Sequence, residues 1–360
     1  MGMAQDTVRR GPFRTLAIEN FRRFKHLTIP RLGDVNLLVG RNSSGKSSVL
    51  EAIRILASDG APEVFRDICR AREEGFADAT KPDLVALSGL CRRGADAGGG
   101  FRISAGEDFV SVTPGLYWRS QDAAGFLRFA PVSADAIDFA EVGLAVESPR
   151  RRHILDENGL STSPRYGGVS QKRPEASCVF VGTEGVSRQR IGSLWQGVAL
   201  TDMEDRLNRL MRESFPEIER VSVVPGERES SCVAKVRGAE RPVPLRSLGE
   251  GAMRFFGLAL SAVAARNGVL LIDEVEIGIH YSVQVEMWRL LVNLAMDLQV
   301  QIFATTHSED AIGAFSIATK DVEAVNGCLI RLQSRGGEIE AVEYSEGELW
   351  ASRDAAAELR

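Results

Sequence analysis

The fold of this chain is decided by Val35-Asn36-Leu37-Leu38-Val39, then Gly40-Arg41-Asn42-Ser43-Ser44-Gly45-Lys46-Ser47, then Ser48-Val49-Leu50-Glu51-Ala52-Ile53. The first five residues are mostly apolar and predict a buried strand. The next eight fit the pattern G-x-x-x-x-G-K-[ST] without deviation. The last six predict the start of a helix with apolar side chains on one face. Strand, glycine loop and helix thus occur in the order that a phosphate-binding loop requires.

The residue types of this loop suit a nucleotide. Its glycines let the backbone turn tightly and approach a ligand closely. Successive backbone N–H groups form an anion-binding concavity, to which the helix adds its positive end. Lys46 is expected to reach the β- and γ-phosphates of ATP, and the Ser47 hydroxyl to ligate Mg²⁺. The alternative is a strand-to-helix turn that binds nothing. The residues expected to contact the nucleotide are Gly40, Arg41, Asn42, Ser43, Ser44, Gly45, Lys46, Ser47 and Ser48.

The composition is ordinary for a soluble globular protein, with 44% hydrophobic and 26% charged residues. The 360 residues suggest about two domains. A net charge of −5 provides no global basic field for nucleic acid. No apolar run reaches the length of a membrane span, and residues 1–12 lack the apolar core of a signal peptide. Five scattered cysteines without a C-x-x-C pair argue for a reducing compartment. We therefore expect a cytoplasmic protein without a membrane partner.

The region 61–242 is rich in glycine, proline and charge. Residues 149–174 predict a long loop or a poorly ordered insertion. The stretch 150–190 holds eight Arg or Lys against four Asp or Glu, which predicts either a nucleic-acid or acidic-partner contact or a solvated loop. Short strands are predicted at Phe101–Ser104, Phe109–Val112, Phe126–Phe129, Val142–Val146 and Cys178–Val181.

The last third of the chain alternates helices and strands. Helices are predicted over Leu248–Arg266 and Tyr281–Leu298, and buried strands over Val269–Ile272 and Val300–Ala304. This alternation implies crossover units and a parallel sheet. We therefore expect an α/β fold in which residues 1–60 and 243–360 form one P-loop domain. Residues 61–242 are expected to form a β-rich and α-helical insertion, part of which belongs to that domain.

A second candidate site is Val269-Leu270-Leu271-Ile272-Asp273-Glu274, where four apolar residues precede two carboxylates in the Walker B pattern. Ligands of open α/β sheets bind beyond the carboxyl ends of the strands. Asp273 is expected to hold Mg²⁺ together with Ser47, and Glu274 to orient and deprotonate an attacking water. Such a strand is common by itself, but its place after a complete phosphate loop makes it specific.

Two further motifs complete a recognisable order. Ser247-Leu248-Gly249-Glu250-Gly251 opens the helix before the acidic pair, and His307 follows the next strand. This order resembles that of ABC-type ATPases, and within them the OLD-type and RecF/SMC-like group, which includes AAA-type ATPases of phage-defence and repair systems. The matching stretches are Ile18–Phe24, Ile272–His280 and Ala304–Ser308. The resemblance covers residues 13–57 and 243–310 and says little about 60–240.

The resemblance implies an ABC-type P-loop ATPase head with a mixed sheet. In this class two heads sandwich two ATP molecules, so the signature turn, Ser247, Gly249 and Glu250, would complete the site of the other head. His307 would sense the γ-phosphate or the water; its alternative is a buried histidine that caps the helix starting at Ser308. The turn departs from the common Leu-Ser-Gly-Gly form.

Three smaller assignments stay open at this point. Arg22 and Arg23 would either pack on the adenine or ribose or form a solvated basic turn. Gln121 is a candidate for the Q-loop glutamine of this class. The D-loop, Gly278-Ile279-His280-Tyr281, would cross the dimer interface.

Two absences shape the expected function. OLD nucleases carry a C-terminal TOPRIM domain with an Asp-x-Asp set, whereas residues 309–360 contain no Asp-x-Asp, and SMC-type coiled coils are missing. We therefore expect an ATPase without a TOPRIM domain that dimerises on ATP and serves as a sensor or scaffold for a separate effector in anti-phage defence. The alternatives are a RecF-like DNA-binding repair or loading ATPase, and a nucleotide-gated binding module with negligible turnover.

Overall fold

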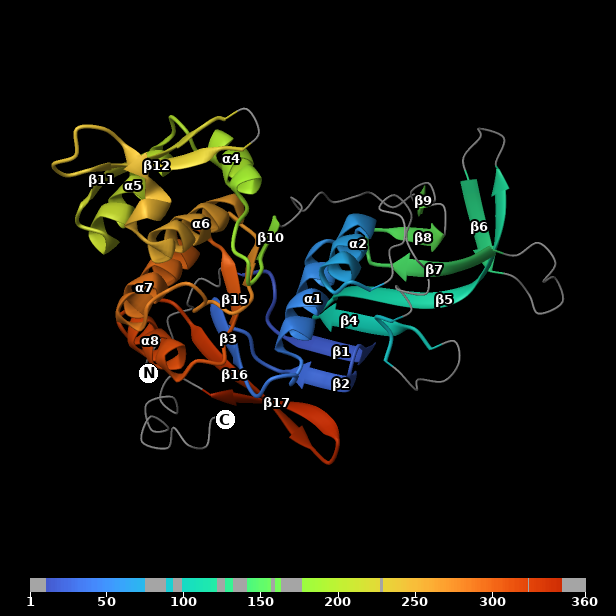
Figure 1. Ribbon diagram of the computed structural model, residues 1–360. Coiled ribbons are helices and arrows are strands. Elements are labelled where there is room, and N and C mark those ends of the chain that lie inside the picture. Colours follow the sequence, from blue (N-terminus) through green and yellow to red (C-terminus); the bar gives the residue numbers. More distant parts are fainter. Residues whose placement is uncertain are drawn as a thin grey trace, which may run out of the picture.

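The computed structural model describes residues 11–74, 89–92, 99–121, 127–131, 141–156, 159–162, 177–226, 229–322 and 324–344. Within these residues the strands form three sheets, of eight, six and three strands (Figure 1). The six-stranded sheet lies between two layers. Helices cover one of its faces, and the helix after the glycine loop, backed by the eight-stranded sheet, covers the other.

The six-stranded sheet carries the predicted motifs. Its order is β10-β14-β15-β3-β16-β17, and every pair is parallel except the C-terminal hairpin β16–β17. The parallel sheet and the α/β class expected from the sequence are therefore confirmed, and the sheet is mixed. Its strands are β3 (Val35–Val39), β10 (Cys178–Val181), β14 (Val269–Ile272), β15 (Gln301–Thr305), β16 (Gly327–Arg335) and β17 (Glu338–Tyr344).

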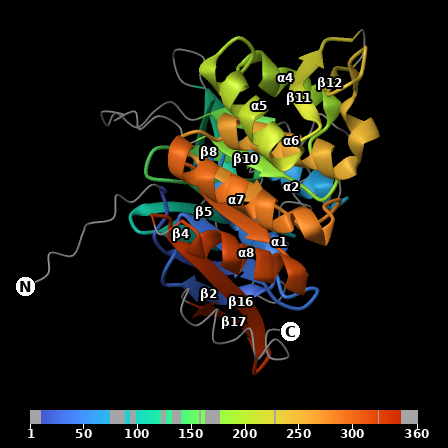
Figure 2. The same ribbon diagram turned by 90° about the vertical axis from the view of Figure 1, so that its left-hand side faces the viewer.

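Alternation along β3 and β14 explains the layers. Leu37 and Leu270 belong to one buried cluster, whereas Leu38 and Leu271 belong to the other. Because successive side chains of a strand point to opposite faces, near-continuous apolar strands must be covered on both sides. The covering helices on one face are α6 (Glu250–Ala264), α7 (Tyr281–Leu298) and α8 (Glu309–Lys320), which Figure 2 shows from their own side.

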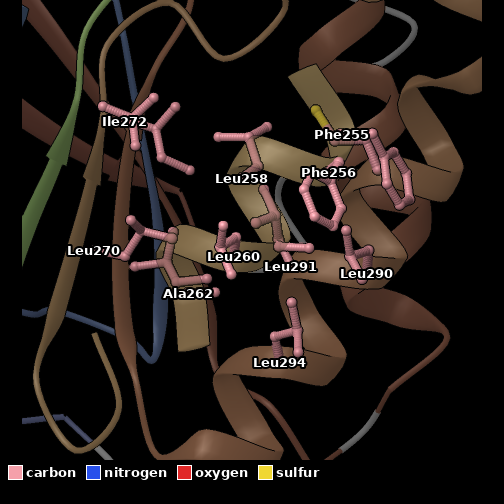
Figure 3. Packing of buried hydrophobic residues seen from close by; sticks show 14 of the residues in the cluster. Phe255, Phe256, Leu258, Leu260, Ala262, Leu270, Ile272, Leu290, Leu291 and Leu294 are labelled. Carbon is pink, nitrogen blue, oxygen red and sulfur yellow. The ribbon is translucent and has the colours of Figure 1, made fainter. Parts of the chain in front are cut away.

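Helix α6 is apolar around most of its surface because it has neighbours on several sides. Figure 3 shows Leu258, Leu260 and Ala262 between β14 and α7. On the far side, Trp195 and Phe215 pack against Phe256 and Phe255, with ring centroids 5.9 and 5.4 Å apart. These partners come from a small layer of α4 (Arg188–Gln196), α5 (Asp202–Ser214), β11 (Ile218–Val224), β12 (Ser231–Val236) and β13 (Val243–Pro244).

The eight-stranded sheet is antiparallel and joins the start of the chain to its middle region, because β4 pairs with β1. Helices α1 (Lys46–Ala57) and α2 (Pro62–Ala71) lie against it (Figure 1). Its strands are β1 (Leu16–Phe21), β2 (Phe24–Ile29), β4 (Phe101–Ala105), β5 (Asp108–Gln121), β6 (Leu127–Pro131), β7 (Glu141–Glu147), β8 (Arg152–Asp156) and β9 (Gly159–Thr162).

Several sequence-based boundaries are wrong. The predicted helix from Leu248 instead begins with a 3₁₀ turn, Leu245–Leu248, and becomes α-helical only after Gly249, whose φ of 109° interrupts it. Strand β5 continues nine residues past the predicted Val112, to Gln121, because β6 and β7 pair along that extension. The predicted loop 149–174 contains β8 and β9, and its residues 157–158 and 163–174 lie outside the described residues.

Within the described part of the chain, no helix combines the length and apolarity that crossing a bilayer requires.

Candidate functional site

The motifs meet at one edge of the six-stranded sheet. Strands β14, β15 and β3 are parallel neighbours, with Leu271 paired to Phe303 and Ala304 paired to Leu37. Their carboxyl ends therefore lie side by side. The loop 40–45, the pair Asp273–Glu274 and the stretch ending in His307 all follow directly from these ends, as ligand-binding groups do in open α/β sheets.

The loop requires its two glycines. Gly40 has φ 143°, and a Cβ there would lie 2.5 Å from the Leu332 carbonyl oxygen. Gly45 has φ 98°, and a Cβ there would lie 2.6 Å from the Phe24 ring. No side chain caps the start of α1 at Gly45. The first N–H groups of this helix therefore have neither an intrahelical partner nor a capping side chain, and they can bind an anion.

Lys46 folds back over the loop. Its Nζ donates to the carbonyl oxygen of Gly40 at 2.8 Å and to that of Arg41 at 3.3 Å. Burial lowers the pKa of Lys46, and the nearby Glu274 and Asp273 carboxylates oppose that shift. A phosphate beside the ammonium would favour its charged form in the same way. The lysine is thus placed to compensate an anionic ligand.

The Asp273 carboxylate accepts hydrogen bonds from two hydroxyl groups. Ser47 Oγ donates to Asp273 Oδ1 at 3.2 Å, and Thr305 Oγ1 donates to the same oxygen at 2.5 Å. Thr305 Oγ1 also accepts the backbone N–H of Glu274 at 2.8 Å. Hydroxyl and carboxylate oxygens are the ligands that Mg²⁺ prefers, so Ser47 and Asp273 fit the predicted metal role. Thr305, to which the sequence pattern alone assigns no task, is therefore a further candidate site residue.

Two carboxylates, Glu274 and Glu276, and the imidazole of His307 lie next to the Ser47–Asp273 pair. Glu274 has φ 48°, an uncommon conformation for a residue other than glycine. Its Oε1 lies 3.7 Å from His307 Nδ1. Glu276 Oε1 lies 3.3 Å from the same Nδ1 and accepts the His307 backbone N–H at 3.2 Å. Glu274 and His307 are therefore close enough to act on one water or phosphate.

His307 is not the buried helix cap that the sequence left as an alternative. Its side chain is 51% exposed. The N-cap of α8 is Ser308, whose Oγ accepts the N–H of Ala311 at 3.3 Å.

The signature turn makes local contacts. Ser247 Oγ donates to the Pro244 carbonyl oxygen at 2.7 Å, and Glu250 pairs with Arg246 at 2.6 Å. Gly249 caps α6 without a capping side chain. All three residues lie on the surface or near it, and their contacts with a second head stay a prediction. The start of α6 lies close to the D-loop, since a Cβ at Gly251 would be 3.6 Å from the Gly278 carbonyl oxygen.

Two basic groups have structural partners. Arg22 is buried and pairs with Glu51 at 3.1 Å and Glu74 at 2.6 Å, so it is neither a solvated turn residue nor free to stack on a base. Arg150 pairs with Asp59 at 2.6 Å and Asp108 at 3.0 Å. These pairs remove part of the local positive excess seen in the sequence.

Gln121 is the last residue of β5 and pairs with Leu127 of β6. This hairpin end lies away from α1 in Figure 1. The structure therefore gives no support to Gln121 as a Q-loop residue.

Two family models match this chain, one in its N-terminal part and one in its C-terminal half. A family model described as "AAA ATPase domain" matches residues 13–86. Another, described as "AAA domain, putative AbiEii toxin, Type IV TA system", matches residues 190–312. The first match contains the glycine loop, and the second contains the signature turn, the Walker B strand and His307. These two stretches of the chain are thus similar in sequence to AAA-type ATPase domains.

Among similar known proteins, an "ATP/GTP phosphatase" of Helicobacter pylori is 23% identical over 330 residues, which are 83% of this chain and 86% of that protein. A "DNA replication and repair protein RecF" of Gloeobacter violaceus is 29% identical over 43% of this chain and 39% of its own length. The RecF of Idiomarina loihiensis is 26% identical over 39% of this chain and 36% of its own length.

Solved structures with similar architecture include an SMC head domain from Thermotoga maritima, at 17% identity, with a TM-score of 0.44 over 92% of this chain and 99% of that one. An Smc head domain bound to the C-terminal domain of ScpA, derived from Pyrococcus furiosus, is 12% identical, with a TM-score of 0.45 over 96% of this chain and 99% of that one. Neither likeness bears on the assignment of the site.

Proposed function

We propose that this chain binds ATP with Mg²⁺ at the carboxyl edge of the six-stranded sheet and hydrolyses it. One observation carries the proposal: Ser47 of the glycine loop and Asp273 of β14, 226 residues apart, hydrogen bond at 3.2 Å, with Glu274 next to them. The "ATP/GTP phosphatase" relative, which aligns over most of both chains, supports a nucleotide-hydrolysing activity.

Each residue has a distinct task in this proposal. The N–H groups of residues 40–48 and Lys46 bind the phosphates. Ser47 and Asp273 hold Mg²⁺, which neutralises phosphate charge when bound. Glu274 orients the attacking water and accepts its proton. Thr305 holds the Asp273 carboxylate and the Glu274 backbone in position through its two hydrogen bonds.

We also infer that two heads associate on ATP. The start of α6 supports this, because it presents an uncapped helix N-terminus near the molecular surface, which suits a phosphate of another copy. The D-loop adds an exposed ring pair: His280 and Tyr281 have ring centroids 4.3 Å apart, and Tyr281 is 65% exposed. Only ATP has the γ-phosphate that would reach Ser247 of the second head.

Substituting Ser247 with arginine tests this trans site. In the hydrolysis-deficient Glu274→Gln background, ATP should produce a larger species than ADP in light scattering. Adding Ser247→Arg should abolish that difference, because a bulky side chain would occupy the phosphate's place. Ser193→Arg is the matched control, since Ser193 is also exposed and its hydroxyl also donates to a backbone carbonyl. A molecular mass independent of the nucleotide in the parent variant would contradict the trans site.

We further propose that the ATPase is a sensor or scaffold for a separate effector in anti-phage defence. The matched family's description as a Type IV TA system supports such a setting. The purified chain should then leave DNA intact with Mg²⁺ or Mn²⁺, and robust cutting would overturn the separate effector.

The RecF relatives favour a second candidate, a DNA-binding repair or loading ATPase. Binding through residues 150–152 would have to compete with the ion pairs of Arg150 and with that of Arg152 to Glu147 at 2.9 Å. Tight duplex binding that weakens steeply with salt and with alanine at these arginines would favour this candidate over the scaffold.

A further inference from the structure

We propose that Glu276 is a positioning residue that fixes the orientation and tautomer of His307 and keeps this imidazole off Glu274. The inference rests on the proposed function for the tasks of Glu274 and His307. Glu276 itself lies two residues beyond the proposed general base, and the sequence pattern predicts no task for it beyond membership of the Walker B and D-loop stretch.

The geometry gives Glu276 two contacts with His307. A single oxygen, Oε1, accepts the His307 backbone N–H at 3.2 Å and lies 3.3 Å from the ring Nδ1. The competing carboxylate of Glu274 lies farther from the same nitrogen, at 3.7 Å. The Glu276 side chain is 10% exposed, compared with 34% for Glu274. Glu276 is thus the nearer and the less solvent-screened of the two partners.

This arrangement determines which ring nitrogen carries the hydrogen. An ionised carboxylate has oxygen acceptors and no hydrogen to donate. A nitrogen lone pair facing two carboxylate oxygens would be repelled, so Nδ1 must carry the hydrogen. In the neutral ring Nε2 is then unprotonated. A carboxylate that orients a functional histidine through its other nitrogen is a general way of fixing the tautomer.

The competition between the two carboxylates has a consequence for hydrolysis. While Nδ1–H faces Glu276, Glu274 keeps its oxygens for the attacking water. Without Glu276, Glu274 is the carboxylate nearest to the same N–H among the described residues, and this contact would occupy the general base. Loss of Glu276 should therefore slow the chemical step and leave ATP binding unchanged.

Helix α6 carries a cation, Arg254, that interacts electrostatically with Glu276. Arg254 is buried, and its Nη1 donates to the Gly182 carbonyl oxygen at 3.1 Å. Two of its other nitrogens, Nε and Nη2, and also Glu276 Oε2, have no hydrogen-bond partner among the described residues. Burial lowers the pKa of Arg254, and the Glu276 carboxylate opposes that shift, as it does for Lys46. Arg254 and Lys46 thus both interact electrostatically with Glu276.

A double-mutant cycle tests whether Glu276 acts through His307. Glu276→Ala should lower kcat roughly tenfold with little change in KM, and the same substitution should have no effect in a His307→Ala background. Glu276→Gln, which keeps the side-chain shape and removes the charge, should also lower kcat, and it covers the case in which the alanine variant fails to fold. Glu309→Ala, an exposed carboxylate just after His307, is the matched control. Equal losses with and without His307 would overturn the proposal.

The tautomer itself can be measured without any turnover. The chain has four histidines, so ¹⁵N-histidine labelling gives a simple spectrum, and His307→Ala identifies the signal. Spectra are recorded about two pH units above the ordinary imidazole pKa of roughly 6.5. In Glu274→Gln, His307 should keep its proton on Nδ1; in Glu274→Gln/Glu276→Ala the proton should move largely to Nε2. Identical spectra would overturn the role of Glu276. A wild-type chain without ATPase activity would contradict the proposed function alone and leave this measurement intact.

Discussion

Replacing Lys46 with alanine should abolish measurable ATP binding. Removing one partner of a close, desolvated charge pair typically costs about 2–5 kcal/mol, or roughly 30- to 5,000-fold in Kd. Lys46 is in that situation, because it is buried over the loop and its Nζ has only the Gly40 and Arg41 carbonyl oxygens as hydrogen-bond partners within the described residues. Titration calorimetry with ATP measures the loss directly.

The matched control is Lys235→Ala. This lysine lies on β12, is 67% exposed and pairs with Glu219, so its removal should leave ATP affinity unchanged. If a Lys46→Ala protein folds normally and binds ATP as tightly as the wild type, the glycine loop is not the nucleotide-binding site.

Replacing Glu274 with glutamine should lower ATP hydrolysis by about 10²- to 10⁴-fold, the usual contribution of a positioned general base. The amide keeps the shape of the side chain but cannot take a proton from water. ATP affinity should stay near that of the wild type, because Asp273 and Ser47 still supply their oxygens and Thr305 still holds Asp273. Phosphate release and calorimetry on the same preparation separate the two effects.

Glu286→Gln serves as the control for this substitution. Glu286 is an exposed carboxylate on α7 that pairs with Arg289 at 2.6 Å. Turnover at the wild-type rate in Glu274→Gln would show that Glu274 is not the general base.

The sequence predicted the parts of the site that are encoded locally. The glycine loop is a continuous motif whose φ angles only its glycines tolerate well, so Gly40 and Gly45 could be assigned with their neighbours. Strand β14 and helix α7 have the predicted bounds because their apolar patterns begin and end sharply. The parallel sheet then follows from the alternation of strands and helices.

What the sequence could not predict depends on contacts between distant residues. A threonine at the end of a strand carries no signal of its own, and Thr305 becomes important only because β15 pairs with β14 beside Asp273. From its neighbours in sequence Arg22 resembles a solvated turn residue, but in the fold it pairs with Glu51 of α1. Strand β5 passes through Pro114 and Gly115, which local propensity disfavours in strands, because β7 pairs with residues 111–117.

The basic run at residues 150–152 illustrates the same limit for charge. Its neighbours in sequence suggest an exposed positive patch, yet Arg150 is held by Asp59, which follows α1, and by Asp108, which begins β5. Charge counts along a sequence cannot reveal such pairing, because the carboxylates come from other elements of the fold.

We propose that Ser47, Asp273 and Glu274 form a Mg²⁺-dependent ATPase site within this chain. Phosphate release by the purified wild-type chain, with ATP and Mg²⁺ and then with EDTA in excess over the metal, tests it most directly. We predict turnover that EDTA abolishes and that returns when Mg²⁺ is restored. Tight ATP binding without phosphate release above that of Glu274→Gln would contradict the claim and would favour a nucleotide-gated binding module.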